Sequence, residues 1–361
     1  MDTRLFQVFF RVDASTSIGA GHISRCCNLA RLLAAEDFEI HFVCADVEGE
    51  MTDWIKAKDF NSEVHLINVI DYKKLLSDVD AILNYDQEDD ALKTAHLIRY
   101  KASSENILII HDHYSLDLKW EASVLRELNP YNVRIAAFDD TGKRDLISNF
   151  IINQNPGSET LTQLYKTKAK KAKQFLGMSY ALIEEAYLQK KTRLPLDHVP
   201  TGLIYFGGCD KFNITQRAIN ALAEINRPLR LNIVNGLQAN NSLDTINIHH
   251  EVNQFNNLPS LWPILSACSF AIGAGGVSAI ERVAAGIPSL IIPIAENQIR
   301  GSLYLATQEC AIHLPTASTA NDIKQKVARL IDSGHTMRIN CLRMDIGDRQ
   351  NEMVHALINI Y

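Results

Sequence analysis

The sequence predicts an α/β protein made of two doubly wound domains that face one another across a cleft. The first half of the chain alternates short apolar segments with longer helical ones. This alternation lapses between about 155 and 199, and a second alternating series then begins. The chain has 361 residues, which is long for a single hydrophobic core, so two domains are expected.

The first domain is expected to cover residues 1–157. We expect its strands at 6–12, 40–44, 81–84, 107–111, 134–138 and 151–153, and its helices at 22–36, 50–58, 88–102 and 116–128. Strands that alternate with helices in this way are typical of a parallel sheet covered on both faces. A Rossmann-like domain is therefore predicted.

A polar, lysine-rich connector is expected over residues 158–199, with one helix at about 180–191. The second Rossmann-like domain is expected over residues 200–343. We expect its strands at 203–206, 229–234, 249–252, 270–272, 289–292 and 311–314, and its helices near 213–226, 259–267, 277–286, 298–309 and 319–333. A last helix, within residues 344–361, is expected to pack back on the first domain.

Composition excludes several classes of protein. The net charge is −6, and the densest basic run, KTKAKKAK at 166–173, contains no aromatic residue, so no nucleic-acid partner is expected. Seven cysteines without paired spacing fit a reducing compartment. The start of the chain has no signal region, and the apolar run 284–295 is short and contains glycine and proline. We expect a cytoplasmic monomer without a membrane partner.

The run Gly19-Ala20-Gly21-His22 opens the first predicted helix, directly after the first strand. Two glycines allow a tight turn, and the free N–H groups of a helix start can bind an anion. The positive end of the helix disfavours the imidazolium form of His22, so this side chain can accept a proton. The alternative is a histidine that only caps the turn.

Two further glycine loops occupy the same kind of position in the second half. The first contains Gly207 and Gly208, and the second contains Gly275, Gly276 and Ser278. Backbone N–H groups at such strand-to-helix turns can hold a diphosphate without a metal ion. No Walker lysine follows either loop, and the spacing does not match the dinucleotide fingerprint. Each loop alone is also compatible with an ordinary turn.

Polar side chains near these loops suit the sugar part of a nucleotide sugar. Glu281 lies within two turns of a predicted helix start, where a carboxylate suits a ribose diol. Glu296, Asn297 and Gln298 follow a strand and suit hydroxyl and acetamido groups, although a helix-capping turn is the alternative.

Two other polar pairs also end predicted strands. His111 and His113 could share a face of an extended strand, but no third ligand is evident, so no metal site is predicted. Asp139 and Asp140 are compatible with a catalytic dyad or, more commonly, with a turn.

Together and in this order, these residues resemble the PseG hydrolases of pseudaminic acid biosynthesis. Those enzymes release UDP from UDP-2,4-diacetamido-2,4,6-trideoxy-β-L-altropyranose. The resemblance covers essentially the whole chain, and single loops of this kind recur in the MurG glycosyltransferases. The segments that carry it are FRVDAS at 10–15, IGAGH at 18–22, Arg25-Cys26, Asp112-His113-Tyr114, Leu116-Asp117, Trp120-Glu121, Phe138-Asp139-Asp140, Asn153-Gln154-Asn155, GMSYAL at 177–182, FGGCD at 206–210, IGAGG at 272–276, Glu281-Arg282 and PIAENQ at 293–298.

The resemblance implies a two-domain GT-B fold and an inverting hydrolysis that needs neither metal nor cofactor. It implies that His22 is the catalytic base and that Glu281 and Asn297 bind the UDP-sugar substrate. From the chemistry, we expect Asp13 or Tyr114 to orient His22 or the sugar. The other residues expected to bind substrate are Gly19, Gly21, Arg25, Gly207, Gly208, Gly275, Gly276, Ser278, Glu296 and Gln298.

The chain departs from the family at Glu184, where relatives often have arginine. If that arginine meets a phosphate or the sugar, the contact is either missing here or supplied by another residue, such as Arg25, Lys211 or Arg300. Two alternatives to the hydrolase remain open. One is a GT-B glycosyltransferase that uses a UDP-amino-sugar donor, and the other is a nucleotide-sugar binding protein without catalytic activity.

Overall fold

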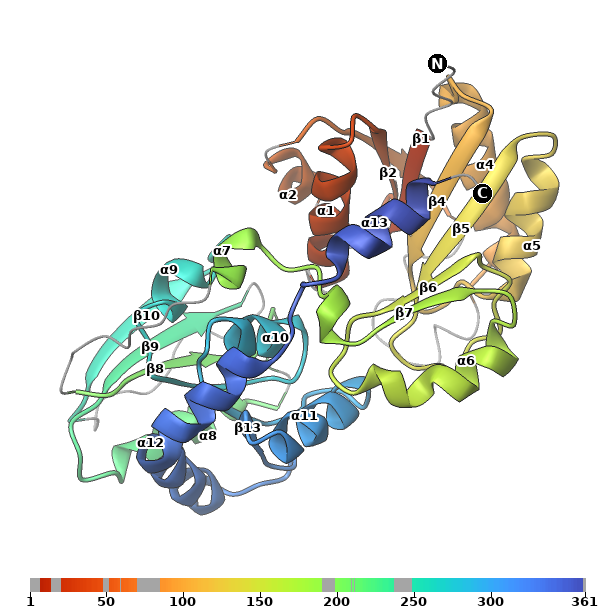
Figure 1. The fold of residues 1–361 in the computed structure, drawn as a ribbon. Coiled ribbons are helices and arrows are strands. Elements are labelled where there is room, and N and C mark those ends of the chain that lie inside the picture. Colours follow the sequence, from red (N-terminus) through yellow and green to blue (C-terminus); the bar gives the residue numbers. More distant parts are fainter. Residues whose placement is uncertain are drawn as a thin grey trace. The chain divides into compact units, whose positions relative to one another are not determined.

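A computed structural model describes residues 7–13, 21–47, 52–58, 60–69, 85–189, 199–208, 210, 212–236 and 249–359. The chain divides into two compact units (Figure 1). Unit 1 comprises Met1–Gln154, Ser158–Leu182 and Asp348–Tyr361, and unit 2 comprises Asn155–Gly157 and Ile183–Gly347.

Unit 1 contains a seven-stranded sheet in which every pairing is parallel. The spatial order is β3-β2-β1-β4-β5-β6-β7. The strands are β1 (Gln7–Val12), β2 (Glu39–Ala45), β3 (Glu63–Ile67), β4 (Asn106–Asp112), β5 (Asn132–Phe138), β6 (Phe150–Asn153) and β7 (Lys173–Leu176). The order reverses between β1 and β4, and doubly wound sheets bind ligands beyond the carboxyl ends of the strands at such a point.

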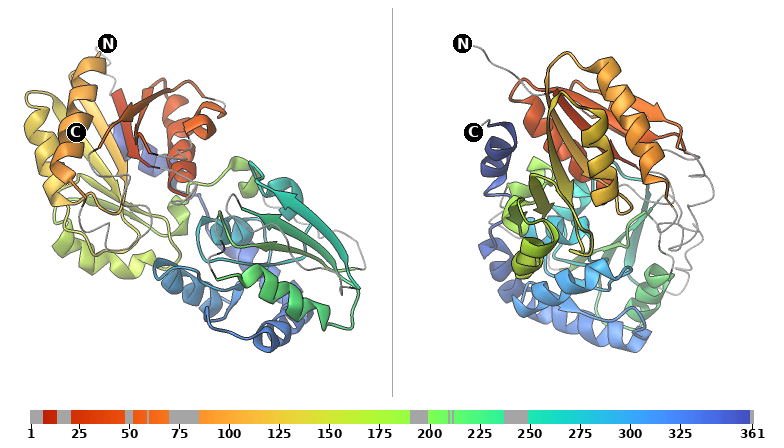
Figure 2. Two further views of the ribbon diagram at one scale, coloured as in Figure 1. Left: turned by 180° about the vertical axis from the view of Figure 1, so that it is seen from behind. Right: turned by 90° about the vertical axis from the view of Figure 1, so that its right-hand side faces the viewer.

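Helices cover both faces of this sheet because its strands are apolar on both sides. In β1, Val8 and Phe10 are buried in one core cluster, together with residues of α1 and α13, whereas Phe9 joins a second cluster with residues of α4 and α5. Seen from behind, α4 and α5 lie in front of the sheet (Figure 2, left). The helices of unit 1 are α1 (Gly21–Ala34), α2 (Thr52–Lys56), α4 (Gln87–Lys101), α5 (Leu118–Glu127), the 3-10 turn η2 (Ser158–Leu161), α6 (Thr162–Lys168), η3 (Met178–Tyr180) and α13 (Gln350–Ile358).

The final helix, α13, completes the core of unit 1. Met353, Val354 and Leu357 are buried in the same cluster as the apolar face of α1. The backbone N–H of Arg349 donates to the carbonyl of Ser179 over 2.9 Å, which ties the start of this segment to η3. Helix α13 therefore belongs structurally with β1 and α1.

Unit 2 contains a six-stranded parallel sheet in the order β10-β9-β8-β11-β12-β13. Its strands are β8 (Thr201–Tyr205), β9 (Arg230–Asn235), β10 (Glu251–Asn256), β11 (Phe270–Gly273), β12 (Ser289–Ile291) and β13 (Ala311–His313). Its helices are α7 (Glu185–Leu188), α8 (Ile214–Ala223), α9 (Trp262–Leu265), α10 (Val277–Ala284), α11 (Asn297–Thr307) and α12 (Ala320–Arg343). Here the strand order reverses between β8 and β11, so both sheets have the same topology.

The predicted fold class is confirmed, with corrections to individual elements. The expected strand 81–84 lies outside the described residues. The stretch 158–199 is not a plain connector, because α6 and β7 lie within it and β7 pairs with β6 as an edge strand. The helix expected at 180–191 is seen only as the short α7, and α12 extends ten residues beyond the expected end at 333. In the part of the chain that the structure describes, no helix is long and apolar enough to cross a membrane.

Candidate active site

His22 lies in the first turn of α1, at the point where the strand order of unit 1 reverses. Its Nδ1 is 2.7 Å from Oδ1 of Asp112, the last residue of β4. The His22 side chain is 16% exposed, whereas that of Asp112 is 1% exposed. Nε2 of His22 has no hydrogen-bond partner among the described residues. The buried carboxylate thus holds one ring nitrogen and leaves the other one to accept a proton.

Arg25 keeps Asp112 ionised. Its Nε and Nη2 donate to the two carboxylate oxygens of Asp112, both over 2.6 Å. Burial opposes ionisation of Asp112, but the charge of Arg25 and the hydrogen bonds from Arg25 and His22 outweigh it and hold the pKa of this carboxyl well below its usual range. An ionised Asp112 favours the tautomer of His22 that carries its proton on Nδ1.

The same guanidinium also binds Asp140, through Nη1 over 2.8 Å and Nη2 over 3.1 Å. Arg25 is 3% exposed and lies 4.6 Å from the ring centre of Phe138. With two carboxylates on its nitrogens and little exposed surface, it has no room for a substrate phosphate. This arrangement opposes the predicted contact between Arg25 and substrate, and it favours a role in positioning Asp112.

Tyr114 contacts His22 through its ring. The two rings meet edge to face, with centres 4.9 Å apart, while the hydroxyl of Tyr114 donates to Oδ2 of Asp140 over 2.9 Å. Burial, and then the charge of Asp140, raises the pKa of Tyr114 well above its usual value, so the phenol stays protonated. Tyr114 packs against the histidine and makes no hydrogen bond to it.

Asp13 does not orient His22, contrary to one of the two roles expected for it. Its carboxylate forms an ion pair with Arg11, accepts the backbone N–H of Ala45 over 2.7 Å and lies 3.3 Å from Nε2 of His113. Burial is again outweighed by Arg11 and His113, which hold the pKa of Asp13 low. The Asp13 carboxylate is part of a buried ionic network with Arg11 and His113, whereas Asp112 lies beside His22.

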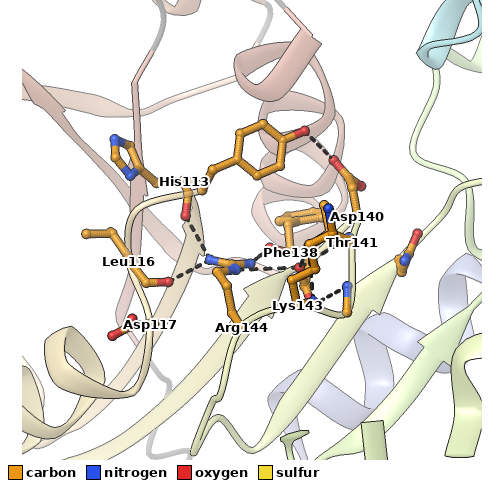
Figure 3. A network of polar contacts seen from close by, with 12 residues as sticks. His113, Leu116, Asp117, Phe138, Asp140, Thr141, Lys143 and Arg144 are labelled. Atoms are coloured by element: carbon orange, nitrogen blue, oxygen red, sulfur yellow. Dashed lines mark hydrogen bonds and ion pairs between the residues drawn. The ribbon is translucent and has the colours of Figure 1, made fainter. Parts of the chain in front are cut away.

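Arg144 is a residue that the sequence did not single out. Its Nη1 donates to the carbonyls of His113 over 2.7 Å and Leu116 over 2.6 Å, and its Nη2 donates to the carbonyl of Phe138 (Figure 3). One guanidinium thus holds together the loops that follow β4 and β5. Asp112 ends β4, and the two loops carry Tyr114 and Asp140, so Arg144 supports the geometry of the site.

Asp139 and Asp140, which the sequence offered as a dyad, have different partners in the structure. Asp139 accepts the backbone N–H groups of Thr141 over 3.3 Å and Gly142 over 3.0 Å, which is a turn-stabilising arrangement. Asp140 instead faces Arg25 and Tyr114. The turn interpretation is therefore confirmed for Asp139.

His111 and His113 do not form a metal pair. Nε2 of His111 is 2.9 Å from Oε1 of the buried Glu121, whereas His113 faces Asp13. Neither histidine belongs to the three-residue group of potential metal ligands that the described residues contain.

In unit 2, the loop with Gly207 and Gly208 packs tightly against Gly236. Gly207 has a positive φ of 84°, and a Cβ on Gly236 would lie 2.2 Å from the carbonyl oxygen of Gly207. The helix that follows is already capped, because Asp210 accepts the N–H groups of Ile214 over 2.9 Å and Thr215 over 2.7 Å. The start of α8 is thus occupied by a carboxylate of the chain itself.

The loop from β11 to α10 has a different electrostatic character. Helix α10 begins after Gly276 without a side-chain cap. Beneath the loop, the fully buried Arg282 donates to the carbonyl of Ala274 over 2.6 Å and to the hydroxyl of Ser278 over 3.1 Å. Burial lowers the pKa of Arg282 to about 10, so it still carries its charge at pH 7. A buried cation and a helix start together favour an anion here.

Gln298 joins this loop to the one that follows β12. Its Oε1 accepts the N–H of Gly275 over 3.1 Å and that of Ile294 over 3.0 Å. A Cβ on Gly275 would lie only 3.0 Å from Cβ of Gln298. The side-chain oxygen of Gln298 is therefore a structural clamp and cannot also receive a hydrogen bond from an acetamido group in the way we expected.

A pocket of about 800 Å³ lies beside these loops within unit 2. Glu296 is among its lining residues, whereas Asn297 is not. The lining residues are Phe212, Arg217, Ile294, Ala295, Glu296, Ile299, Thr316 and Ala317. A mostly apolar pocket with one carboxylate suits an organic ligand that also has hydroxyl groups.

The remaining expected residues are placed as follows. Gly21 is the first residue of α1, whereas Gly19 and Lys211 lie outside the described residues. Glu281 lies in α10, and its charge raises the pKa of Tyr205 after the larger effect of burial. Glu184 accepts a hydrogen bond from Ser260 over 2.7 Å, so it has a structural role within unit 2.

Comparisons with known proteins agree with this topology. The structure is similar to MurG of Acinetobacter baumannii, with a TM-score of 0.65 and 14% identity over 97% of this chain and 99% of that one. The chain has the GT-B fold. It is also similar to the calicheamicin glycosyltransferase CalG4, with a TM-score of 0.64 and 15% identity over 98% of each chain. The glycosyltransferase VinC in complex with dTDP matches with a TM-score of 0.60 and 13% identity over 98% of this chain and 99% of that one.

Sequence comparison is less informative. No family model matches the chain. The uncharacterized protein MJ1062 of Methanocaldococcus jannaschii is 22% identical over 97% of this chain. The chain spans 65% of the length of that protein.

Proposed function

We propose that this protein cleaves a nucleotide-diphosphate sugar at its anomeric carbon, with His22 as the general base. The observation that carries this proposal is the buried, ionised Asp112 on Nδ1 of a partly exposed histidine. A water or hydroxyl group that attacks an anomeric carbon must lose its proton, and Nε2 of His22 is available to take it. Asp112 then stabilises the imidazolium that forms.

Unit 2 is proposed to bind the nucleotide. The uncapped start of α10, with Arg282 buried behind it, supplies N–H dipoles and a fixed positive charge for the diphosphate. These groups also stabilise the negative charge that develops as the diphosphate leaves. The complex of VinC with dTDP supports a nucleoside diphosphate as the ligand of this fold.

Water is the proposed acceptor, which makes the protein a UDP-sugar hydrolase. This finer proposal depends on the ordered resemblance to the PseG hydrolases, and it names UDP-2,4-diacetamido-2,4,6-trideoxy-β-L-altropyranose as the substrate. The second candidate is a glycosyltransferase that passes the sugar to a hydroxyl group. CalG4 and VinC, which are named as glycosyltransferases, favour that candidate.

The test is release of UDP from this donor in the presence of EDTA, with and without hydroxyl acceptors. Wild type should release UDP and free sugar without an acceptor. Both His22→Ala and Asp112→Asn should lower kcat by roughly 10²- to 10⁴-fold while the Kd for UDP changes little. The matched control is His335→Ala, which removes an exposed histidine of α12 in unit 2.

Each other outcome decides between the candidates. UDP release that requires a hydroxyl acceptor would establish a glycosyltransferase and overturn the hydrolase. Tight binding of the donor without any turnover would leave a binding protein. Full hydrolysis by His22→Ala would overturn the assignment of the base.

A further inference from the structure

Three potential metal ligands converge at the amino end of the unit 1 sheet, on the edge opposite to His22 and Asp112. They are His41, the third residue of β2, and Glu63 and His65, the first and third residues of β3. Their ligand atoms all lie within 4.8 Å of one another. We propose that these three side chains bind a divalent metal ion of the Zn²⁺ type. This site is independent of the proposed function.

The distances between the three ligand atoms match a zinc site. Nδ1 of His41 lies 3.2 Å from Nε2 of His65 and 3.9 Å from Oε2 of Glu63, and the third side of this triangle is 3.5 Å. Three atoms with these separations lie on a circle with a radius of about 2.1 Å, which is the usual Zn–N and Zn–O bond length. An ion can therefore reach all three atoms without moving the backbone. Two imidazoles and one carboxylate are a common ligand set for zinc.

Glu39 orients His41, as a carboxylate that accepts the second N–H of a metal-binding histidine does in metal sites. Its Oε1 lies 3.1 Å from Nε2 of His41, so it can accept that N–H and leave the Nδ1 lone pair for the ion. Nε2 of Gln7 also lies 3.1 Å from Nε2 of His41. Gln7 has two amide hydrogens, however, and these suffice for its bonds to Oε2 of Glu39 over 2.8 Å and to the carbonyl of Lys101 over 3.2 Å. This arrangement is stronger evidence for a site than the three ligands alone.

The site reaches solvent through Glu63, whose side chain is 54% exposed, whereas the side chains of His41 and His65 are 1% and 12% exposed. Lys101 is the competing group, since its Nζ donates to Oε2 of Glu63 over 2.8 Å. Its side chain is 32% exposed and can turn toward water when an ion binds. Loss of this lysine should therefore strengthen metal binding.

The experiment measures binding of Zn²⁺ to the EDTA-stripped full-length protein by equilibrium dialysis and metal analysis. Wild type should bind one ion per chain at this site. His65→Gln and Glu63→Gln should each weaken binding at least about 10-fold, and Glu39→Gln should weaken it by roughly 10- to 100-fold. Lys101→Ala should bind Zn²⁺ more tightly than wild type. His96→Gln, on the exposed side of α4, is the control and should bind as wild type does.

The opposite results would overturn the site. If His65→Gln and Glu63→Gln bind as much Zn²⁺ as wild type, the ion is held elsewhere. If wild type binds none, the two histidines form only a hydrogen-bonded pair. Thermal unfolding with added Zn²⁺ provides a second measurement, since an ion that binds only the folded state raises Tm in wild type and not in Glu63→Gln. Glu63 is half exposed, so its substitution does not threaten folding.

Discussion

The carboxylate of Asp112 orients His22, although burial alone would favour its neutral form. Asp112 remains ionised because Arg25 binds both of its oxygens, and Arg25 in turn is held by Asp140. Without the guanidinium, Asp112 would gain a proton and could no longer accept the Nδ1 hydrogen in the same way. Arg25 therefore acts on the candidate base through a second residue and is a positioning residue.

These ion pairs predict a loss of stability in acid. The pKa values of Asp13, Asp112 and Asp140 are all lowered in the folded protein, against burial, by Arg11 or Arg25. A lowered folded-state pKa adds stability that is fully present above the unfolded pKa of about 4 and is lost as pH falls below it. We expect the urea midpoint of unit 1 to fall steeply below about pH 4. The unfolding of Asp140→Asn should depend less on pH, and an identical dependence would contradict the assignment.

At the scale of single residues, the sequence identified His22 as a candidate and did not identify Asp112 as its partner. Asp13 and Asp112 both end strands, and β1 and β4 are neighbours, with Val12 paired to Asp112. The chemistry of the reaction led us to expect Asp13 or Tyr114 beside His22, and nothing in the sequence pointed to Asp112 instead. Only the strand order and the direction of α1 decide which carboxylate reaches the ring. The same limit applies to Arg144, whose three carbonyl partners come from two different loops.

At the scale of elements, the site depends on close contacts between loops. The most demanding contact is at Gly236, where any Cβ would collide with the backbone of Gly207 and Gly208. Gly236→Ala should lower the free energy of unfolding of unit 2 by roughly 1–3 kcal/mol, because the loop must shift. Gly334→Ala is the matched control, since a Cβ there meets nothing within 4 Å inside α12. It should stabilise the helix by up to about 1 kcal/mol.

Urea unfolding of the two glycine variants, followed by circular dichroism, measures both effects. Equal destabilisation by the two substitutions would show that the contact seen at Gly236 is not a constraint. A change in the Kd for UDP with Gly236→Ala, and not with Gly334→Ala, would further connect this loop to nucleotide binding.

Central strands could be predicted more easily than edge strands. β1 and β4 are buried along their whole length, and each contains a central apolar run, VFF in β1 and ILII in β4. β3 and β7 are edge strands in which some side chains reach solvent, so their sequences, EVHLI and KQFL, carry no clear pattern. For that reason the segment around β7 was interpreted as part of a connector. The metal ligands on β2 and β3 were missed for the same reason, because β3 was not foreseen.

At the scale of the whole molecule, both sheets reverse their strand order at the first strand of the unit. The candidate base lies at that point in unit 1, and the candidate diphosphate loop follows β11, at that point in unit 2. The fold class could be predicted because alternating strands and helices of this length have few other solutions. The two units are not two consecutive stretches of the sequence, because the chain returns to unit 1 after Gly347.

Because α13 completes the core of unit 1, a substitution in α13 should lower the stability of that unit. Leu357 is fully buried in the core cluster that α13 shares with α1. Leu357→Ala should therefore lower the free energy of unfolding of unit 1 by roughly 2–5 kcal/mol. Hydrogen exchange should increase in α1 and β1 and remain unchanged in β8 and β11 of unit 2. Increased exchange in unit 2 would contradict the division into units.

The position of α13 also affects how the protein can be made in the cell. Domains usually fold in the order in which the ribosome releases them, from the amino end onward. Here the segment that closes the core of unit 1 is synthesised only after the whole of Ile183–Gly347. During translation, the apolar face of α1 therefore remains exposed to solvent until the residues of unit 2 have been synthesised. Nascent unit 1 therefore exposes apolar surface that a chaperone can bind.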